Sequence, residues 1–351
     1  MVIWTIEFKL DFVINCSLFR HAKDTVGLYY YNSKEGGVLM VEGIVYSYET
    51  NKLLKYLRLI KKYYYIVFGV SFLIMASLNW FLHIILVQYT GYILLVSFTC
   101  FTVSNEIRRD VNKVKFLIIA IPYIVFILAI FIYGNDIWHY VLDWEMSRTM
   151  MFNINDLFAK IPFNNASFTR IYKPLWLTEY MKLVYVNGFA LSVLIPFFRA
   201  ALSIDFKKML RYTLSAHIFQ VLFITPFYVT FYLQNVWFVY GHADPLARNM
   251  SYAEAAKSTL NGLPSMHTSI AFAMFLLVIR ERNTIFKWCW GFFCLSVIYS
   301  TMYLEIHWVI DVIAGMVFGF LIVKLVDFVL LRANTILAHR FNNGKQSTYY
   351  V

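Results

Sequence analysis

The sequence predicts an all-α protein that crosses a membrane several times, and three observations support this fold class. Hydrophobic residues make up 60% of the 351 residues, charged residues make up only 15%, and the mean hydropathy is +0.60. Soluble proteins average about 25% charged residues. Long apolar runs also alternate with short charged patches. This composition excludes a soluble globule, a collagen, a disordered chain and a disulfide scaffold.

The apolar runs predict about eight transmembrane helices, since one crossing needs about 20 apolar residues. Residues 63–103 carry almost no charge over twice that length, so we expect a helical hairpin that turns between Asn79 and Gln88. Single crossings are expected at residues 114–133, 176–198, 212–232, 265–279, 286–304 and 308–331. The predicted organisation is an N-terminal cytoplasmic or interfacial segment (1–62), the hairpin (63–113), a transmembrane domain (114–331) and a cytoplasmic tail (332–351). Leucines and basic residues within 46–62 suit an interfacial helix or a flanking linker.

The distribution of charge predicts the topology of the chain. Its 31 Lys and Arg residues exceed its 20 Asp and Glu residues, which gives a net charge of +11. Every second loop is basic, at residues 55–62, 108–115, 199–211, 280–287 and 332–345. Because short cytoplasmic loops are rich in Lys and Arg, we place these loops and both termini in the cytoplasm. The two long loops, 134–175 and 237–264, mix both signs and are placed outside. The positive charge therefore reflects topology, and we expect no nucleic-acid partner.

Ionisable residues at membrane depth are functional candidates, and two segments concentrate them. His267 and His307 are separated by two predicted crossings with a basic turn between them, so both should face the outer side. Asp311 follows His307 by four residues on the expected helix, where its carboxylate can accept the imidazole N–H. An imidazole oriented in this way can act as a nucleophile, and a second histidine can transfer a proton. Pro264 should begin a helix whose first amides and the Ser265 hydroxyl form a cradle for phosphate.

These segments resemble a known family. The sequence PSMH at residues 264–267 and the S-x6-H-x3-D spacing at residues 300–311 are similar to the second and third motifs of the type 2 phosphatidic acid phosphatase superfamily. The resemblance implies that His307 is the nucleophile that becomes phosphohistidine, that Asp311 orients it, and that His267 protonates the leaving group. It also implies that Ser265 and Ser300 bind the phosphate.

The chain departs from the family pattern in two places. Thr301 stands where the family usually has arginine, and a lysine followed seven residues later by Arg-Pro is absent from the sequence. The pattern therefore resembles the inositol phosphorylceramide synthase-like branch, which keeps the two histidines and the aspartate without the full lysine and arginine set. The segment DLFAKIP at residues 156–162, together with Tyr180 and Tyr185, is similar to that branch.

This resemblance implies a six-helix catalytic bundle whose active site opens to the extracytoplasmic or luminal face of the membrane. The implied activity is lipid phosphotransfer, in which a phosphoryl or inositol-phosphoryl group moves from a phospholipid donor to an alcohol acceptor through phosphohistidine. If the acceptor is water, the protein is instead a lipid phosphate or polyprenyl (pyro)phosphate phosphatase. The third interpretation is a non-catalytic membrane protein with a relic site. No motif specifies the lipid backbone, the head group or the oligomeric state.

The charge of a bound phosphate needs a cation on the outer side. Arg248 is the first candidate, because the segment 242–248 leads toward PSMH; Arg170, Lys173 and Lys257 are the other outer cations. We expect no cofactor and no metal site. Two histidines and a carboxylate can form a metal triad, but a carboxylate four residues after a histidine is better suited to orienting the imidazole. The expected partners are membrane lipids, a lipid phosphate donor and a water or alcohol acceptor.

Overall fold

The computed structural model describes residues 56, 59–60, 62–83, 88–108, 110–147, 152–260 and 262–347. The chain divides into two compact units, residues 1–64 and residues 65–351. The interfacial helix predicted within residues 46–62 lies mostly outside the described residues, as does Cys16. All of the elements discussed below belong to the second unit, except that the first helix begins one residue before it.

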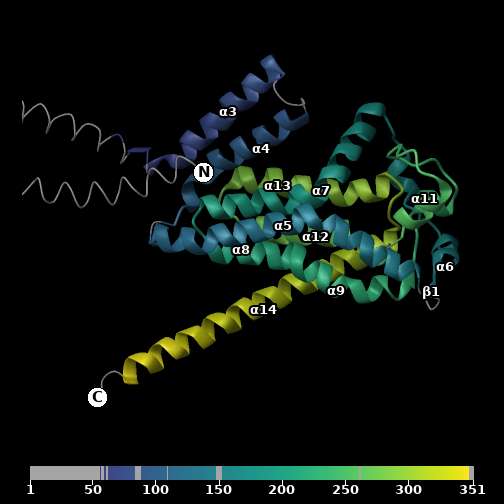
Figure 1. The fold of residues 1–351 in the computed structure, drawn as a ribbon. Coiled ribbons are helices and arrows are strands. Elements are labelled where there is room, and N and C mark those ends of the chain that lie inside the picture. Colours follow the sequence, from purple (N-terminus) through teal and green to yellow (C-terminus); the bar gives the residue numbers. More distant parts are fainter. Residues whose placement is uncertain are drawn as a thin grey trace, which may run out of the picture. The chain divides into compact units, whose positions relative to one another are not determined.

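The described part of the chain is mostly helical (Figure 1). The long helices are α3 (Tyr64–Leu82), α4 (Gln88–Thr102), α5 (Lys113–Met146), α7 (Leu175–Leu202), α12 (Met266–Val278), α13 (Thr284–Tyr303) and α14 (Val309–Ser347). The shorter helices are α6 (Asn155–Lys160), α8 (Phe206–Thr213), α9 (Phe219–Tyr228), α10 (Val236–Val239) and α11 (Tyr252–Ser258). Short 3₁₀ turns lie at Ser104–Glu106 and Ser167–Arg170. Strands β1 (Phe152–Asn153) and β2 (Phe231–Tyr232) form a small parallel pair.

Five helices in the described residues are long and apolar enough to cross a membrane, which fits a multi-pass membrane protein. They are Tyr64–Leu82, Lys113–Gly134 within α5, Leu175–Leu202, Thr284–Tyr303 and Val309–Ile336 within α14. Tyr89–Thr102 and Met266–Val278 are apolar but shorter. The predicted hairpin turn falls between the end of α3 and the start of α4.

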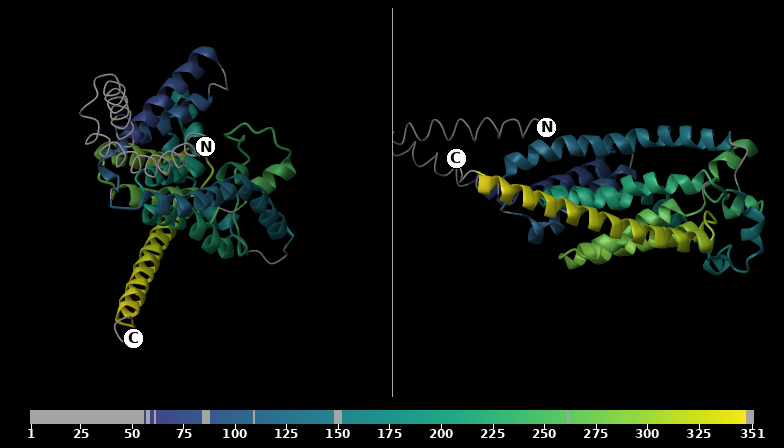
Figure 2. Two further views of the ribbon diagram at one scale, coloured as in Figure 1. Left: turned by 60° about the vertical axis from the view of Figure 1, so that its left-hand side comes forward. Right: turned by 90° about the horizontal axis from the view of Figure 1, so that it is seen from below.

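Three boundaries differ from the predicted spans. Helix α5 continues past residue 133 to Met146, since its polar continuation contains no proline to break it, and the following loop is correspondingly shorter. Helix α14 continues to Ser347 for the same reason (Figure 2). The span predicted over residues 212–232 is divided into α8, a π-helical turn at Leu214–Ile218, and α9. The helix stays continuous through this turn, and the Gln220 side chain in α9 donates to the Ser215 carbonyl within it at 2.9 Å, a contact that hydropathy does not encode.

Helices α12 and α14 pack with unusually close backbones, because two glycines face α12. A Cβ atom added to Gly319 would lie 2.5 Å from the carbonyl oxygen of Ser269, and one added to Gly315 would lie 2.7 Å from that of Ser265. Small residues spaced by four are a common basis for close helix contacts in membranes. This contact joins α12, whose second residue is His267, to α14, which follows His307.

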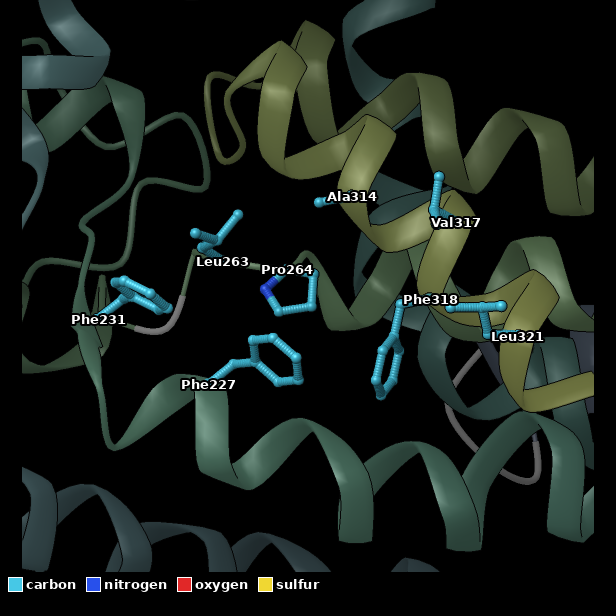
Figure 3. Close-up of a pocket in the computed structure, with 8 residues that line it drawn as sticks. All are labelled: Phe227, Phe231, Leu263, Pro264, Ala314, Val317, Phe318 and Leu321. Atoms are coloured by element: carbon cyan, nitrogen blue, oxygen red, sulfur yellow. The ribbon is translucent and has the colours of Figure 1, made fainter. Parts of the chain in front are cut away.

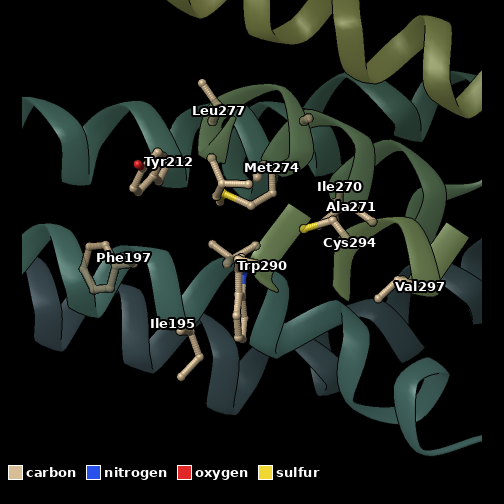
Figure 4. Packing of buried hydrophobic residues seen from close by; sticks show 14 of the residues in the cluster. Ile195, Phe197, Tyr212, Ile270, Ala271, Met274, Leu277, Trp290, Cys294 and Val297 are labelled. Atoms are coloured by element: carbon tan, nitrogen blue, oxygen red, sulfur yellow. The ribbon is translucent and has the colours of Figure 1, made fainter. Parts of the chain in front are cut away.

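The main apolar core lies among α7, α8, α12 and α13 (Figure 4). Trp290 of α13 is central to it and stacks on Phe286 with ring centroids 5.9 Å apart. Its indole nitrogen donates to the Ser192 carbonyl of α7 at 3.4 Å. Other side chains shown in Figure 4 come from α7 (Ile195, Phe197), α8 (Tyr212), α12 (Ile270, Ala271, Met274, Leu277) and α13 (Cys294, Val297). This packing fixes the helices that carry the candidate site.

A buried ionic cluster lies at the other end of these helices. The Arg199 guanidinium contacts Glu106 at 3.0 Å and Glu281 at 2.7 Å, and the Lys208 ammonium contacts the same carboxylates at 2.8 and 3.0 Å. Tyr212 donates a hydrogen bond to Glu281. Burial raises the pKa of Glu281 to about 7, and the neighbouring Glu106 carboxylate adds to this rise. Burial opposes ionisation of Glu106 as well, but its hydrogen bonds with Glu281, Arg199 and Lys208 hold its pKa well below the ordinary range.

Candidate active site

His307 lies in the turn between α13 and α14, two residues before the helix on which it was expected, and it is still paired with Asp311 in the first turn of α14. The His307 Nδ1 atom is 3.3 Å from Asp311 Oδ2. The same carboxylate oxygen accepts the Trp308 backbone N–H at 3.1 Å, which fixes its orientation. The His307 side chain is 6% exposed and that of Asp311 is fully buried. Because Nδ1 faces the carboxylate, the Nε2 atom is the one left for chemistry.

Polar contacts from the long loops hold the turn that carries His307. The backbone N–H of Val309 donates to the Asn164 carbonyl at 2.8 Å, and that of Ile310 donates to Asn164 Oδ1 at 2.9 Å. Asn164 thus satisfies the first amides of α14, which the helix itself cannot do. The Asn235 side chain also donates to the Ile306 carbonyl at 2.7 Å. Sequence analysis did not single out these asparagines, since an Asn in a loop carries no distinctive pattern.

Ion pairs of Glu305 also stabilise the turn that carries His307. Glu305 has a left-handed backbone, with φ of 57°. Its carboxylate lies 3.3 Å from Arg170 Nε and also contacts His242 Nδ1. Arg170 donates in addition to the Met302 carbonyl at 3.2 Å. Arg170, one of the outer cations, is therefore committed to holding the turn.

His267 is the second residue of α12 and faces His307. The two imidazole centroids are 6.3 Å apart, and the rings are tilted by 51°. The Tyr185 ring stacks on His267 with centroids 4.7 Å apart and an interplanar angle of 22°. Phe189 meets His267 edge-on at 5.6 Å. The structure thus brings together the three residues predicted for catalysis, and it adds two aromatic side chains from α7.

The two predicted serine ligands are buried, and their hydroxyls bond within their own helices. Ser265 is the N-cap of α12: its hydroxyl accepts the Thr268 N–H at 3.3 Å and donates to the Thr268 hydroxyl at 2.9 Å. The Ser300 hydroxyl donates to the Val297 carbonyl at 2.7 Å. Thr301, at the usual arginine position, donates to the Ile298 carbonyl at 2.7 Å. Phosphate binding by Ser265 and Ser300 stays a prediction.

Arg248 interacts electrostatically with Tyr185, the residue that stacks on His267, and it is itself paired with Asp244. Its guanidinium makes two hydrogen bonds to Asp244, at 2.8 and 3.1 Å, and its side chain is 37% exposed. Burial would raise the pKa of Asp244, but the bonds from Arg248 hold it below its ordinary value. Arg248 and Asp244 both act electrostatically on the Tyr185 phenol. Part of the Arg248 guanidinium is therefore occupied by Asp244, and the rest is available to a ligand.

The segment at residues 156–162 contacts the site through its aromatic residue. The Phe158 ring meets the Trp308 ring edge-on with centroids 6.0 Å apart, next to His307. Asp156 of the same segment is exposed. Tyr180, predicted alongside Tyr185, donates to the Ser296 hydroxyl at 3.2 Å. The segment therefore supports the His307 turn by packing.

Within the described residues, no group of three or more His, Cys, Asp or Glu side chains is arranged to hold a metal ion. The Asp311 carboxylate lies beside the His307 ring nitrogen and the Trp308 amide, in an orienting position. This geometry gives His307 a hydrogen-bond acceptor, which is what a nucleophilic imidazole requires.

An apolar groove of about 410 Å³ lies between α9 and α14 beside the start of α12 (Figure 3). Pro264, immediately before the N-cap of α12, is at its centre in Figure 3. Its other lining residues are all apolar: Phe227, Phe231, Leu263, Ala314, Val317, Phe318 and Leu321. Gly262, next to the lining residue Leu263, lies close to Asp311, since a Cβ atom added to it would be 3.3 Å from Asp311 Oδ2.

Two comparisons relate this chain to known proteins. No solved structure matches the chain. An uncharacterized protein of Methanocaldococcus jannaschii is 27% identical over 203 residues, which cover 56% of this chain and 81% of that protein. Residues 209–332, from α8 into α14, match the family model of the PAP2 superfamily, and this stretch contains His267, His307 and Asp311.

Proposed function

We propose that this chain is a membrane-embedded lipid phosphotransferase that moves a phosphoryl or inositol-phosphoryl group through a phosphohistidine at His307. Members of the matched superfamily are generally phosphatases or phosphotransferases that act on lipid phosphates. The observation that carries the proposal is the pairing of His307 Nδ1 with Asp311 at 3.3 Å, with the His267 ring facing the same imidazole.

In the first step, the lone pair of His307 Nε2 attacks the phosphorus atom of the donor. The bond from phosphorus to the leaving oxygen breaks, and His267, protonated at the start, gives its proton to that oxygen. The imidazolium character that develops on His307 is stabilised by the Asp311 carboxylate. The products of this step are phosphorylated His307, neutral His267 and a free alcohol.

In the second step, an acceptor oxygen attacks the phosphorus atom on His307. Neutral His267 takes the proton from the acceptor, the nitrogen–phosphorus bond breaks, and both histidines return to their starting states. An alcohol acceptor gives a new phosphodiester or phosphomonoester. A water acceptor gives inorganic phosphate, and the protein is then a lipid phosphate or polyprenyl (pyro)phosphate phosphatase.

The charge of the transferring phosphoryl group is met by two features. The backbone amides of Met266 and His267 occupy the first positions of α12, where a helix supplies no acceptor and favours an anion. Arg248 supplies the cation, with the guanidinium atoms that Asp244 leaves free. Ser265 and Ser300 would need to turn their hydroxyls toward the substrate.

The membrane arrangement belongs to the same proposal. It has about eight crossings, an N-terminal segment (1–62), a hairpin (63–113), a six-helix catalytic domain (114–331) and a tail (332–351). Both termini lie in the cytoplasm, and the site opens to the extracytoplasmic or luminal face. The basic loops support this orientation.

A labelled-phosphate balance tests the function. Purified protein in detergent receives a mixed pool of labelled phospholipids and polyprenyl phosphates, with EDTA present, and with or without inositol. Label in a new organic phosphate, either an inositol phosphate or a new lipid, only when an alcohol is supplied establishes transfer, whereas label released as inorganic phosphate establishes hydrolysis. The control is His307→Ala. If the wild type moves no more label than His307→Ala in either form, the site is a relic and the proposal is wrong.

A further inference from the structure

The two facing histidines are oriented in different ways. His307 has a carboxylate partner, Asp311, and a backbone turn fixed by Asn164. Neither ring nitrogen of His267 has a hydrogen-bond partner among the described residues. A side chain that must transfer a proton in both steps still needs a fixed ring plane, because small errors of position are costly in rate.

The His267 imidazole is contacted by aromatic rings instead of by a hydrogen-bond partner. Tyr185 stacks on the His267 imidazole at 4.7 Å, and Phe189 meets it edge-on at 5.6 Å. The two residues are four apart on α7, so they share one face of that helix. Together with the His307 ring at 6.3 Å, they enclose the imidazole on three sides. Stacked and edge-on arrangements are the favoured geometries for such rings.

Helix α7 is itself held in place at this point. Gly188 lies between Tyr185 and Phe189, and a Cβ atom added to it would lie 2.6 Å from a methyl group of Val297 in α13. The α7 backbone therefore approaches α13 as closely as a glycine permits. The Tyr185 ring is further packed against the cluster that includes Leu304 and Ile306, in the turn that carries His307. Tyr185 and the turn that carries His307 thus pack in the same apolar cluster.

We propose that Tyr185, supported by Phe189, is the positioning residue for His267: its ring holds the imidazole plane for proton transfer in both steps. This inference rests on the proposed phosphohistidine chemistry. The ring, rather than the hydroxyl, carries the role, because the stacking contact is made by the ring. Tyr185 also interacts electrostatically with Arg248, the cation assigned to the phosphate.

The test compares two donors that differ in how much they need a proton from His267. One is the lipid phosphate turned over in the labelled balance, whose leaving alkoxide must be protonated. The other is 4-nitrophenyl phosphate, whose nitrophenolate leaves without a proton. Single-turnover rates of bond cleavage are measured for wild type, His267→Ala, Tyr185→Leu and Tyr185→Phe.

We expect Tyr185→Leu to lower the single-turnover rate with the lipid donor about 10- to 100-fold, with an unchanged KM. Its nitrophenolate burst should fall much less than its rate with the lipid donor, and His267→Ala should show the same difference between the two donors. Tyr185→Phe keeps the ring and should restore the rate with both donors. In the His267→Ala background, Tyr185→Leu should cause no further loss, since the two act through one group.

A matched control is Tyr180→Leu, which removes a ring from the same helix whose hydroxyl bonds Ser296. Its effect on rate should be equal for both donors and should persist in the His267→Ala background. If Tyr185→Leu behaves in this way, or if Tyr185→Phe is as impaired as Tyr185→Leu, the positioning role is wrong. If His307→Ala keeps the nitrophenolate burst, the proposed function fails instead.

NMR of the histidine rings does not depend on activity, so it further separates failure of the positioning role from failure of the proposed function. In ¹⁵N- and ¹³C-histidine-labelled protein, the His267 ring signals are assigned by their loss in His267→Ala. Stacking on Tyr185 should shift the ring protons upfield, and Tyr185→Leu should move them downfield while leaving the His307 signals in place. Unchanged His267 shifts in Tyr185→Leu would overturn the contact on which the inference depends.

Discussion

Replacing Gly315 or Gly319 by alanine tests whether the contact between α12 and α14 sets the distance between the two histidines. Gly315 lies one turn after Asp311, and its neighbour on α12 is the Ser265 carbonyl, two residues before His267. The added methyl group meets backbone oxygen in both variants. Backbone atoms cannot rotate away as a flexible side chain can, so the helices themselves must separate.

The size of that separation follows from the structure. An ordinary contact to a Cβ atom begins near 3.4 Å, whereas the added atom would lie at 2.7 Å for Gly315 and 2.5 Å for Gly319. The helices must therefore open by about 0.7 to 0.9 Å at these points. Overpacking of this kind costs about 1–3 kcal/mol of stability. A displacement near 1 Å at a reacting pair can lower the rate about 100-fold.

Thermal unfolding in detergent and single-turnover cleavage of the lipid donor measure the two effects. Gly291→Ala in α13 is the matched control, because its added Cβ would lie 3.6 Å from Phe275, an ordinary contact. We expect Gly315→Ala and Gly319→Ala to be less stable and slower, and Gly291→Ala to resemble wild type. If all three variants match wild type in both assays, the glycine contact does not set the site geometry.

Further predictions concern single side chains. Asp311→Asn removes the acceptor that orients His307 and should lower kcat about 10²- to 10⁴-fold, as measured with the lipid donor; a loss below about tenfold would contradict that role. Arg248→Gln should lower kcat/KM about tenfold at low salt, with a smaller effect at high salt, because the guanidinium is partly exposed. If the variant and wild type have equal kcat/KM at both salt concentrations, Arg248 does not bind the phosphate. The raised pKa of Glu281, about 7 against an ordinary 4.5, means that the folded state binds more protons between these values. The free energy of unfolding should therefore fall as pH rises from about 5 to 8, by at most about 1.4 kcal/mol per pH unit, and Glu281→Gln should flatten this dependence. A flat wild-type profile in thermal unfolding would contradict the protonation of Glu281.

Much of the fold could be predicted from composition and charge, because the cost of burying charge in a bilayer leaves a direct pattern in the sequence. The apolar runs located α7, α13 and the first part of α14. The π-helical turn within residues 206–228 depends on backbone bonds and is accompanied by the Gln220 side-chain contact, so hydropathy could not reveal it. The close approach of α12 and α14 did have a signal, the spacing of Gly315 and Gly319, which sequence analysis did not use.

The candidate site divides in the same way. His307 lies two residues before α14 and Asp311 lies in the first turn of that helix, so a pair only four positions apart follows from local geometry. The placement of His267 opposite them required only that α12 and α13 lead the chain away and back between the two histidines. The contact of Tyr185 with His267, by contrast, joins residues 82 positions apart through the packing of three helices. Such contacts depend on tertiary packing that no local pattern specifies.

The most direct test of the account is a phosphoenzyme trap in the His267→Ala variant. With 4-nitrophenyl phosphate labelled at phosphorus, this variant should form phosphohistidine without needing an acid and should lack the base that releases it. We predict a label on the protein that is stable to alkali, labile to acid and absent from the His267→Ala, His307→Ala double variant. Equal labelling of both variants, or no labelling of either during nitrophenol release, would contradict His307 as the nucleophile.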